Sequence, residues 1–187
     1  MDCLIALLDS ASVAAFIGAF SAFLLVILND WRRDRRTLVN IKNEVEMNRD
    51  QAKGKLGTLM TNHAALKDQD LVIYGEIIRF STGLIRALST SVLHRFSGAH
   101  RRALDALCYM MEATDNLLSE INKTTEGFRP SSGLSDEERI VLVKELNGYY
   151  HDGIVNMRRL IVICNFYLEG NYKAVLSKKY IVEEYQE

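Results

Sequence analysis

Cysteine and proline are scarce in this chain, which has 187 residues, three cysteines and a single proline. So few of either exclude a disulfide-stapled framework and the proline-rich or collagen-like classes. An excess of one charge is also missing, since 23 basic and 24 acidic residues leave a net charge of -1. An electrostatic function must therefore come from local clusters, not from the chain as a whole.

The sequence patterns of common active sites and metal sites are absent as well. There is no C-x-x-C pair, glycine-rich nucleotide fingerprint, phosphate-binding loop or G-x-S-x-G elbow. No histidine lies within four residues of another or three residues after a glutamate, which excludes the helical di-iron pattern. We therefore expect no cofactor, no metal and no enzyme activity, although catalytic groups that meet only in space escape this test.

A long apolar run lies near the N-terminus. Residues 11–29, ASVAAFIGAFSAFLLVILN, carry no charge. As a helix at ~1.5 Å per residue this run is about 28 Å long, close to the ~30 Å hydrocarbon core of a bilayer. Acidic residues precede it and four arginines follow it, the reverse of a cleaved signal peptide. We expect a retained membrane helix over residues 11–30; the alternative, a core helix of a soluble protein, would place those arginines beside a core.

The charges on either side of the run predict its orientation. Basic residues follow it but none precede it, and the positive-inside rule places the basic side in the cytoplasm. We therefore expect residues 1–10 to be a short non-cytoplasmic N-terminus of a single-pass inner-membrane protein. The residues assigned to topology and to lipid headgroups are Trp31, Arg32, Arg33, Arg35 and Arg36.

Small residues recur every four positions in the same segment, at Ser10, Ala14, Gly18 and Ala22. This spacing places them on one helix face, where a second membrane helix can approach closely. The pattern predicts a homo-oligomer or a membrane-protein partner. Alanine and glycine are also common in membrane helices that do not associate, which is the alternative.

Apolar residues at three- and four-residue spacing continue after the run. No glycine or proline occurs between Gly18 and Gly54, so the membrane helix is expected to continue into the body as a stalk. A weaker helical stretch at about 71–88 follows, as one helix or as two short helices divided at the polar residues 81–83. A helix from about 98 to 122 comes next. The last long helix begins at a capping box on Ser135 and ends at Gly170.

These patterns predict an all-α fold: an N-terminal transmembrane helix that continues into an antiparallel cytoplasmic bundle of about four helices. We expect the bundle over residues 31–169, a loop near 123–134, and a C-terminal tail of undecided conformation over 170–187. Asn48 lies on the seam of the stalk, where a buried amide can fix coiled-coil register and partner number, or it lies at the bundle edge. Cys108 and Cys164 lie on or beside seams and are expected to be buried.

Basic residues gather between residues 77 and 104, which contain five arginines and no acidic residue. Three of them, Arg95, Arg101 and Arg102, surround the expected start of a helix at Gly98, where backbone N–H and guanidinium groups could hold a phosphate or carboxylate. Contact with anionic lipid is one alternative, and nucleic acid is not expected. The other alternative is pairing with acidic residues of the last helix, namely Glu137, Glu138, Glu145 or Asp152.

Residues 41–48, IKNEVEMN, directly follow the apolar run and its arginines. In this context the segment resembles a widespread set of uncharacterised bacterial, archaeal and phage proteins. Those proteins have an N-terminal membrane helix, a basic juxtamembrane stretch, a hydrophobic-x-x-Glu-hydrophobic-x-x-Asn signature and a helical cytoplasmic domain. The resemblance implies the same architecture and a prokaryotic setting, and it carries no catalytic residues.

Together, these features favour a membrane-anchored helical scaffold or interaction protein of the inner membrane, oligomeric and in contact with membrane lipid. The alternative is a ligand-gated membrane effector that senses an anion or nucleotide through the arginine-rich segment. Such an effector would need two states that bind the ligand differently, which no sequence pattern can show.

Overall fold

The computed structural model describes the backbone of residues 2–67, 79–126 and 135–177, and side chains from Val13 onward. Within these ranges the regular elements are all helical and no strand occurs. They are α1 (Asp2–Lys67), α2 (Thr82–Ser91), the short 3-10 helix η1 (Leu93–Arg95), α3 (Gly98–Glu126), α4 (Asp136–Leu168) and α5 (Tyr172–Val175). The predicted all-α fold is confirmed.

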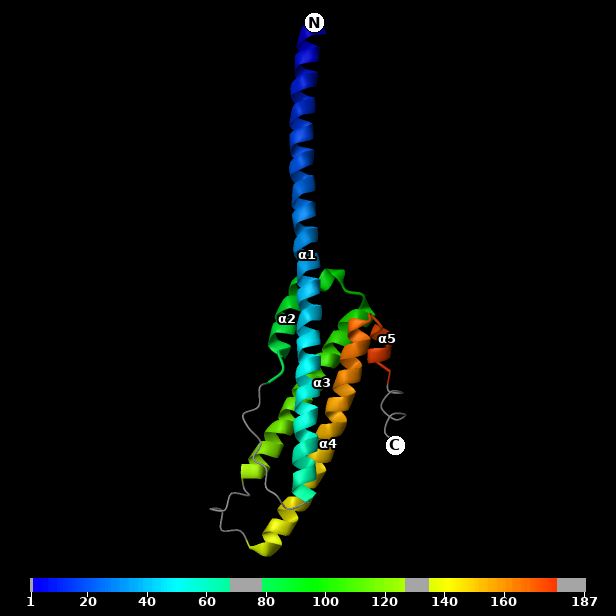
Figure 1. Ribbon diagram of the computed structural model, residues 1–187. Coiled ribbons are helices and arrows are strands. Elements are labelled where there is room, and N and C mark those ends of the chain that lie inside the picture. The colour runs from blue at the N-terminus through cyan, green and yellow to red at the C-terminus, as the bar shows by residue number, and fades with distance from the viewer. Residues whose placement is uncertain (1, 68–78, 127–134, 178–187) are drawn as a thin grey trace.

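Helix α1 is continuous over 66 residues, a length of about 100 Å at ~1.5 Å per residue. Figure 1 shows that its N-terminal half projects beyond the other helices, whereas its C-terminal half lies against them. Every side chain from Val13 to Arg33 is exposed, and the first buried side chain is that of Asp34. The apolar helix therefore does continue into the body, as predicted.

The C-terminal half of α1 forms an antiparallel bundle with α2, α3 and α4 (Figure 1). Helix α4 packs along both α1 and α3, and the short α2 covers α1. The seams that the sequence predicts converge in one core, whose fully buried side chains include Ile41, Val45, Leu59, Leu107, Met111, Leu118, Met157 and Leu160. Burial of these apolar side chains is the main force that holds the bundle together.

Gly153 of α4 is buried where α4 meets α1 and α3. A Cβ at this position would lie 3.4 Å from both Leu59 Cδ1 of α1 and Ile121 Cδ1 of α3. The missing side chain thus lets the three helices approach closely, and a residue larger than alanine would push them apart.

Helix α3 ends at Glu126, beyond the predicted end near residue 122, so the first residues of the predicted loop at 123–134 are helical. The reason is that the seam continues from Ile121 to Thr125, which is buried. The Thr125 hydroxyl donates to the Ile121 carbonyl at 2.7 Å, so its burial leaves no polar group without a partner. The rest of that loop, 127–134, lies outside the described residues.

The predicted boundaries of the last long helix are confirmed. Ser135 Oγ accepts a hydrogen bond from the Glu138 amide at 3.3 Å, and the Glu138 carboxylate accepts one from the Ser135 amide at 2.8 Å. After α4 ends, Gly170 adopts a positive φ of 77° that favours glycine. The predicted tail contains a short helix: α5 packs on α3 and α4 and buries Ala174 and Val175. Residues 178–187 lie outside the described ranges.

Candidate functional site

A buried acidic residue marks the point where α1 enters the bundle. The Asp34 side chain is only 6% exposed, and its Oδ2 accepts hydrogen bonds from Arg95 Nε at 2.8 Å and His94 Nε2 at 3.0 Å. The Arg95 hydrogen bond, helped by His94, holds the pKa of the Asp34 carboxyl below its ordinary value. Asp34 therefore ties η1 to α1 at the end of the bundle from which the apolar helix projects (Figure 1).

Asp34 is not among the site residues that the sequence predicts, which in this segment are Trp31 and the four arginines. The signal was present, because Asp34 precedes Leu38 and Ile41 by four and seven residues and so lies on the seam face of the helix. An acidic residue on such a face needs a buried partner, and the basic segment after residue 77 supplies it.

The structure places the three predicted anion-binding arginines in different environments. Arg95 is bound to Asp34, and Arg101 donates from Nη2 to the Leu93 carbonyl at 2.7 Å. Arg102 is exposed. Ser97 Oγ accepts from the His100 amide at 3.2 Å, so this side chain already caps the start of α3. The anion site and the ligand-gated alternative stay predictions, and the geometry adds no observation in their favour.

The ion pairs that the described residues of this basic segment form are with α3 and α1, and not with α4. Arg86 contacts Glu112 of α3 at 3.1 Å, and Arg95 contacts Asp34 of α1. Both Arg86 and Glu112 are nearly half exposed, so their pair adds little to stability. Within the described residues the basic segment therefore joins α2 and η1 to α3 and α1.

An aromatic cluster next to η1 surrounds His100 of α3. The imidazole stacks on the ring of Tyr172 of α5, with 4.0 Å between the ring centroids. The centroid of the Phe96 ring lies 4.1 Å from that of the imidazole. His100 Nε2 lies 2.9 Å from the hydroxyl of Tyr167, which is buried in α4. Burial, with a smaller effect of the Lys42 charge, lowers the pKa of His100 below its ordinary value of 6.5. The cluster joins α3, α4 and α5 around a neutral imidazole.

We expect this cluster to make stability depend on pH. The native state binds the His100 proton less readily than the unfolded chain does, so stability is lost as pH falls below about 6.5. In His100→Gln this component of the pH dependence should disappear, whereas replacing the exposed His151 by Gln should leave it unchanged. Urea unfolding of the detergent-solubilised chain across this pH range measures the effect, and equal pH slopes for wild type and His100→Gln would contradict it.

A second polar cluster fixes the start of α2 against α1. Asn48 is fully buried; its Nδ2 donates to Ser81 Oγ at 2.9 Å and its Oδ1 accepts from the Ser81 amide at 3.0 Å. The Ser81 hydroxyl donates to Glu44 Oε2 at 2.8 Å. Glu44 and Asn48, the two polar residues of the 41–48 signature, thus both hold Ser81. The bundle-edge alternative for Asn48 is wrong, and its partner in the structure is α2 of the same chain.

Replacing Asn48 by alanine should cost about 1–3 kcal/mol of unfolding free energy, because the Ser81 amide and hydroxyl each lose a buried partner. Asn43, an exposed residue on the same helix, provides the matched control, and Asn43→Ala should cost less than about 0.5 kcal/mol. Equal unfolding midpoints for the two variants in urea would show that Asn48 does not fix the register of α2.

An ion pair with low exposure also holds the residues just before α2 against α1 and α3. Lys55 Nζ of α1 lies 3.3 Å from Asp115 Oδ1 of α3, and both side chains are 11% exposed. Asp115 Oδ2 accepts from the Phe80 amide at 2.9 Å, and Lys55 Nζ lies 3.8 Å from the Phe80 ring centroid. Burial lowers the pKa of Lys55, and the neighbouring carboxylate opposes this shift. Residues from α1 and α3 therefore hold both Phe80 and Ser81.

The cysteines of the bundle are structural. Cys108 and Cys164 are buried, as predicted, and burial raises the pKa of their thiols to about 11 and about 12. Thiols with such pKa values are unreactive at neutral pH. Within the described residues no group of histidine, cysteine or acidic side chains is arranged to hold a metal ion.

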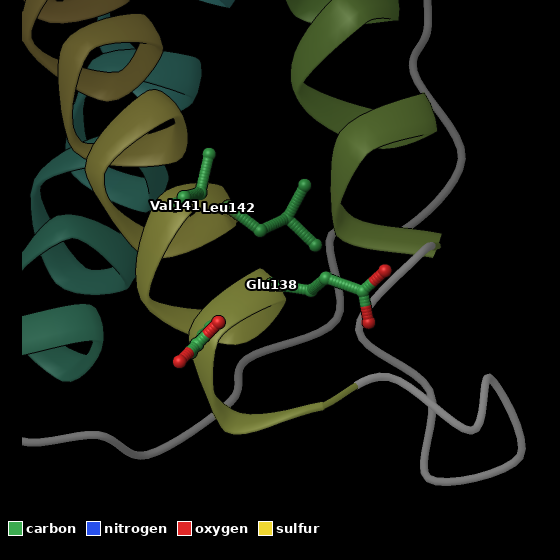
Figure 2. A pocket seen from close by; sticks show the side chains of 4 residues that line it. Glu138, Val141 and Leu142 are labelled. Atoms are coloured by element: carbon green, nitrogen blue, oxygen red, sulfur yellow. The ribbon is translucent and has the colours of Figure 1, made fainter.

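A pocket of about 320 Å³ lies at the start of α4, lined by Glu137, Glu138, Val141 and Leu142 (Figure 2). Val141 and Leu142 form an aliphatic wall. The Glu138 carboxylate is already bound to Ser135 in the capping box. The two glutamates are the polar members of this lining, and no nucleophile or second titratable residue type lies beside them.

Comparison of the chain with protein-family models, with curated proteins and with solved structures found no match. The resemblance of residues 41–48 therefore stays a prediction. A functional conclusion must come from the physical properties of the chain itself. The most prominent of these is the bare apolar half of α1.

Proposed function

We propose that this chain is a single-pass, membrane-anchored helical scaffold of a prokaryotic inner membrane. The observation that carries the proposal is the uncovered apolar part of α1. Its most apolar window has a mean hydropathy of 2.0, and the bundle buries none of it. A core helix of a soluble protein would be covered by its own fold, whereas this one exposes large apolar side chains on every face, as a bilayer-spanning helix does.

The charges at the end of the apolar run support a cytoplasmic bundle. Arg32, Arg33, Arg35 and Arg36 are all exposed. Trp31 is 47% exposed, and the Arg35 guanidinium lies 5.3 Å from its ring centroid. An indole and several arginines at this depth suit the headgroup layer, and basic residues favour the cytoplasmic side.

The small-residue face supports self-association within the membrane. Ala14, Gly18 and Ala22 are exposed, and a Cβ placed on Gly18 would have no other residue within 4 Å. The Ser10 side chain lies outside the described ones. A second copy could therefore pack against this face with close backbone contact. In such an oligomer the membrane helices would bring several cytoplasmic bundles together, which is how the chain would act as a scaffold.

The mass of the detergent-solubilised full-length particle tests this function. Light scattering should report a dimer or larger oligomer for the wild type and a monomer for Gly18→Leu, because leucine blocks the close approach. Phe20→Leu changes a side chain about 200° away around the helix and should leave the oligomer intact. A monomeric wild type, or an oligomer that Gly18→Leu does not weaken, would contradict self-association through this face.

A further inference from the structure

The position of Asp34 on α1 sets the depth of η1 relative to the proposed membrane. Asp34 lies six positions beyond Leu28, the last apolar residue of the run. Along a helix this is about 9 Å. The polar layer on each side of the hydrocarbon core is about 5–8 Å thick. Because Asp34 binds both His94 and Arg95, η1 is held beside the headgroup layer, at its cytoplasmic edge, whenever α1 crosses the bilayer.

The surface of η1 suits such a position. Leu93 is 44% exposed, an uncovered apolar side chain in the short helix that Asp34 holds against α1. The side chains of His94 and Arg95 keep 62% and 43% exposure although each touches Asp34. Arg101 is also exposed and holds the Leu93 carbonyl. An exposed leucine next to arginines matches an anionic lipid surface, where apolar and electrostatic attraction act together.

No acidic side chain opposes this contact from η1 or its neighbours in sequence, since residues 77–104 contain none. Asp34 is buried and bound to two basic side chains, and the exposed Asp30, one turn closer to the membrane on α1, is paired with Arg33 at 3.1 Å. The four exposed arginines of α1 lie on the membrane side of the same point or within two residues of it. Basic side chains of both α1 and η1 therefore lie near the point where α1 enters the bundle, and they outnumber the acidic ones there.

We propose that η1 is a second membrane contact, in which Leu93 enters the anionic headgroup layer while His94, Arg95 and Arg101 face lipid phosphates. The inference rests on the proposed membrane anchor and adds to it. Two contact points, α1 and η1, fix the rotation and tilt of the bundle against the bilayer. A bundle held only by α1 could swing about the stalk.

Depth-dependent fluorescence quenching in nanodiscs tests this contact with the full-length chain. A bimane label is attached at Leu93→Cys in a Cys3→Ser background, because Cys108 and Cys164 are buried. The nanodiscs contain phosphatidylglycerol and a headgroup spin-labelled lipid as quencher. Phe20→Cys in the apolar run, labelled and quenched by lipid spin-labelled in the acyl chain, reports the anchor. Met47→Cys, 51% exposed and 13 residues beyond Asp34 along α1, provides the distant control.

We expect headgroup quenching at position 93 to be several-fold stronger than at position 47, and to weaken when phosphatidylcholine replaces the anionic lipid. Position 20 should be quenched by the acyl-chain label in both lipids. If position 20 is quenched and position 93 behaves like position 47, the η1 contact is wrong and the anchor stands. If position 20 is not quenched, both fail. Ser91→Cys, an exposed neighbour of η1, repeats the test should the Leu93 variant fold poorly.

Discussion

Replacing Asp115 by alanine should destabilise the bundle by about 3–5 kcal/mol, because the substitution leaves the Lys55 ammonium buried without its counter-ion. The Lys55 and Asp115 side chains are both 11% exposed, so water cannot replace the lost partner at low cost. The Phe80 amide also loses its acceptor. Urea unfolding of the detergent-solubilised chain, followed by circular dichroism, measures the loss.

Two control variants test whether the loss of stability comes from the burial of the Lys55–Asp115 pair or would follow from breaking any ion pair. Glu112→Ala breaks the half-exposed pair with Arg86 and should cost less than about 1 kcal/mol. The double variant Lys55→Met with Asp115→Leu removes both charges together and should recover much of the stability that Asp115→Ala loses. A cost for Asp115→Ala no larger than that for Glu112→Ala would mean that the Lys55 pair behaves like a surface ion pair.

Two arginines placed in the apolar run should release the chain from the membrane. Phe20→Arg and Leu24→Arg lie one turn apart near its centre, and each arginine at that depth costs about 2.5–3.5 kcal/mol of insertion free energy. Their sum, roughly 5–7 kcal/mol, corresponds to more than a thousandfold change in partition at about 1.4 kcal/mol per decade. Sedimentation of cell membranes after an alkaline carbonate wash should find the wild type in the pellet and the double variant outside the membrane.

Two arginines placed on the bundle, instead of in the apolar run, provide the control. Val39→Arg and Met47→Arg change exposed residues of α1 beyond the point where it enters the bundle, and they should leave the chain in the membrane pellet. A double variant at Phe20 and Leu24 that still resists the carbonate wash would show that the apolar run is not embedded in lipid.

Local sequence patterns were enough to predict α1, α3 and α4. The run before Trp31, the seams and the capping box at Ser135 each depend on residues within a few positions of one another, so their signals survive without tertiary knowledge. The weaker stretch predicted at about 71–88 is wrong in its bounds: residues 79–81 are not helical, α2 runs from Thr82 to Ser91, and residues 71–78 lie outside the described ranges. The end of α3 was misplaced because Thr125 is polar by type, while its hydroxyl is satisfied by its own helix and its burial continues the seam.

The clusters that fix the bundle were harder to foresee because their partners are distant in sequence. Asp34 and its basic partners lie 60 and 61 residues apart, and Asn48 and Ser81 lie 33 apart. Arg95 illustrates the difficulty: a basic residue beside a helix start suits an anion, a lipid or an acidic side chain equally well. Only the packing of η1 against α1 shows that Arg95 binds Asp34.

The reaction of Cys3 with a membrane-impermeant maleimide tests most directly whether α1 crosses the membrane with the bundle in the cytoplasm. Cys3 precedes the apolar run, whereas Cys108 and Cys164 are buried with raised pKa values. In bacterial cells with a permeable outer membrane and an intact inner membrane, we predict labelling of Cys3. Met47→Cys in a Cys3→Ser background should be labelled only after lysis. Labelling of Met47→Cys before lysis, with Cys3 protected in the wild type, would contradict the account.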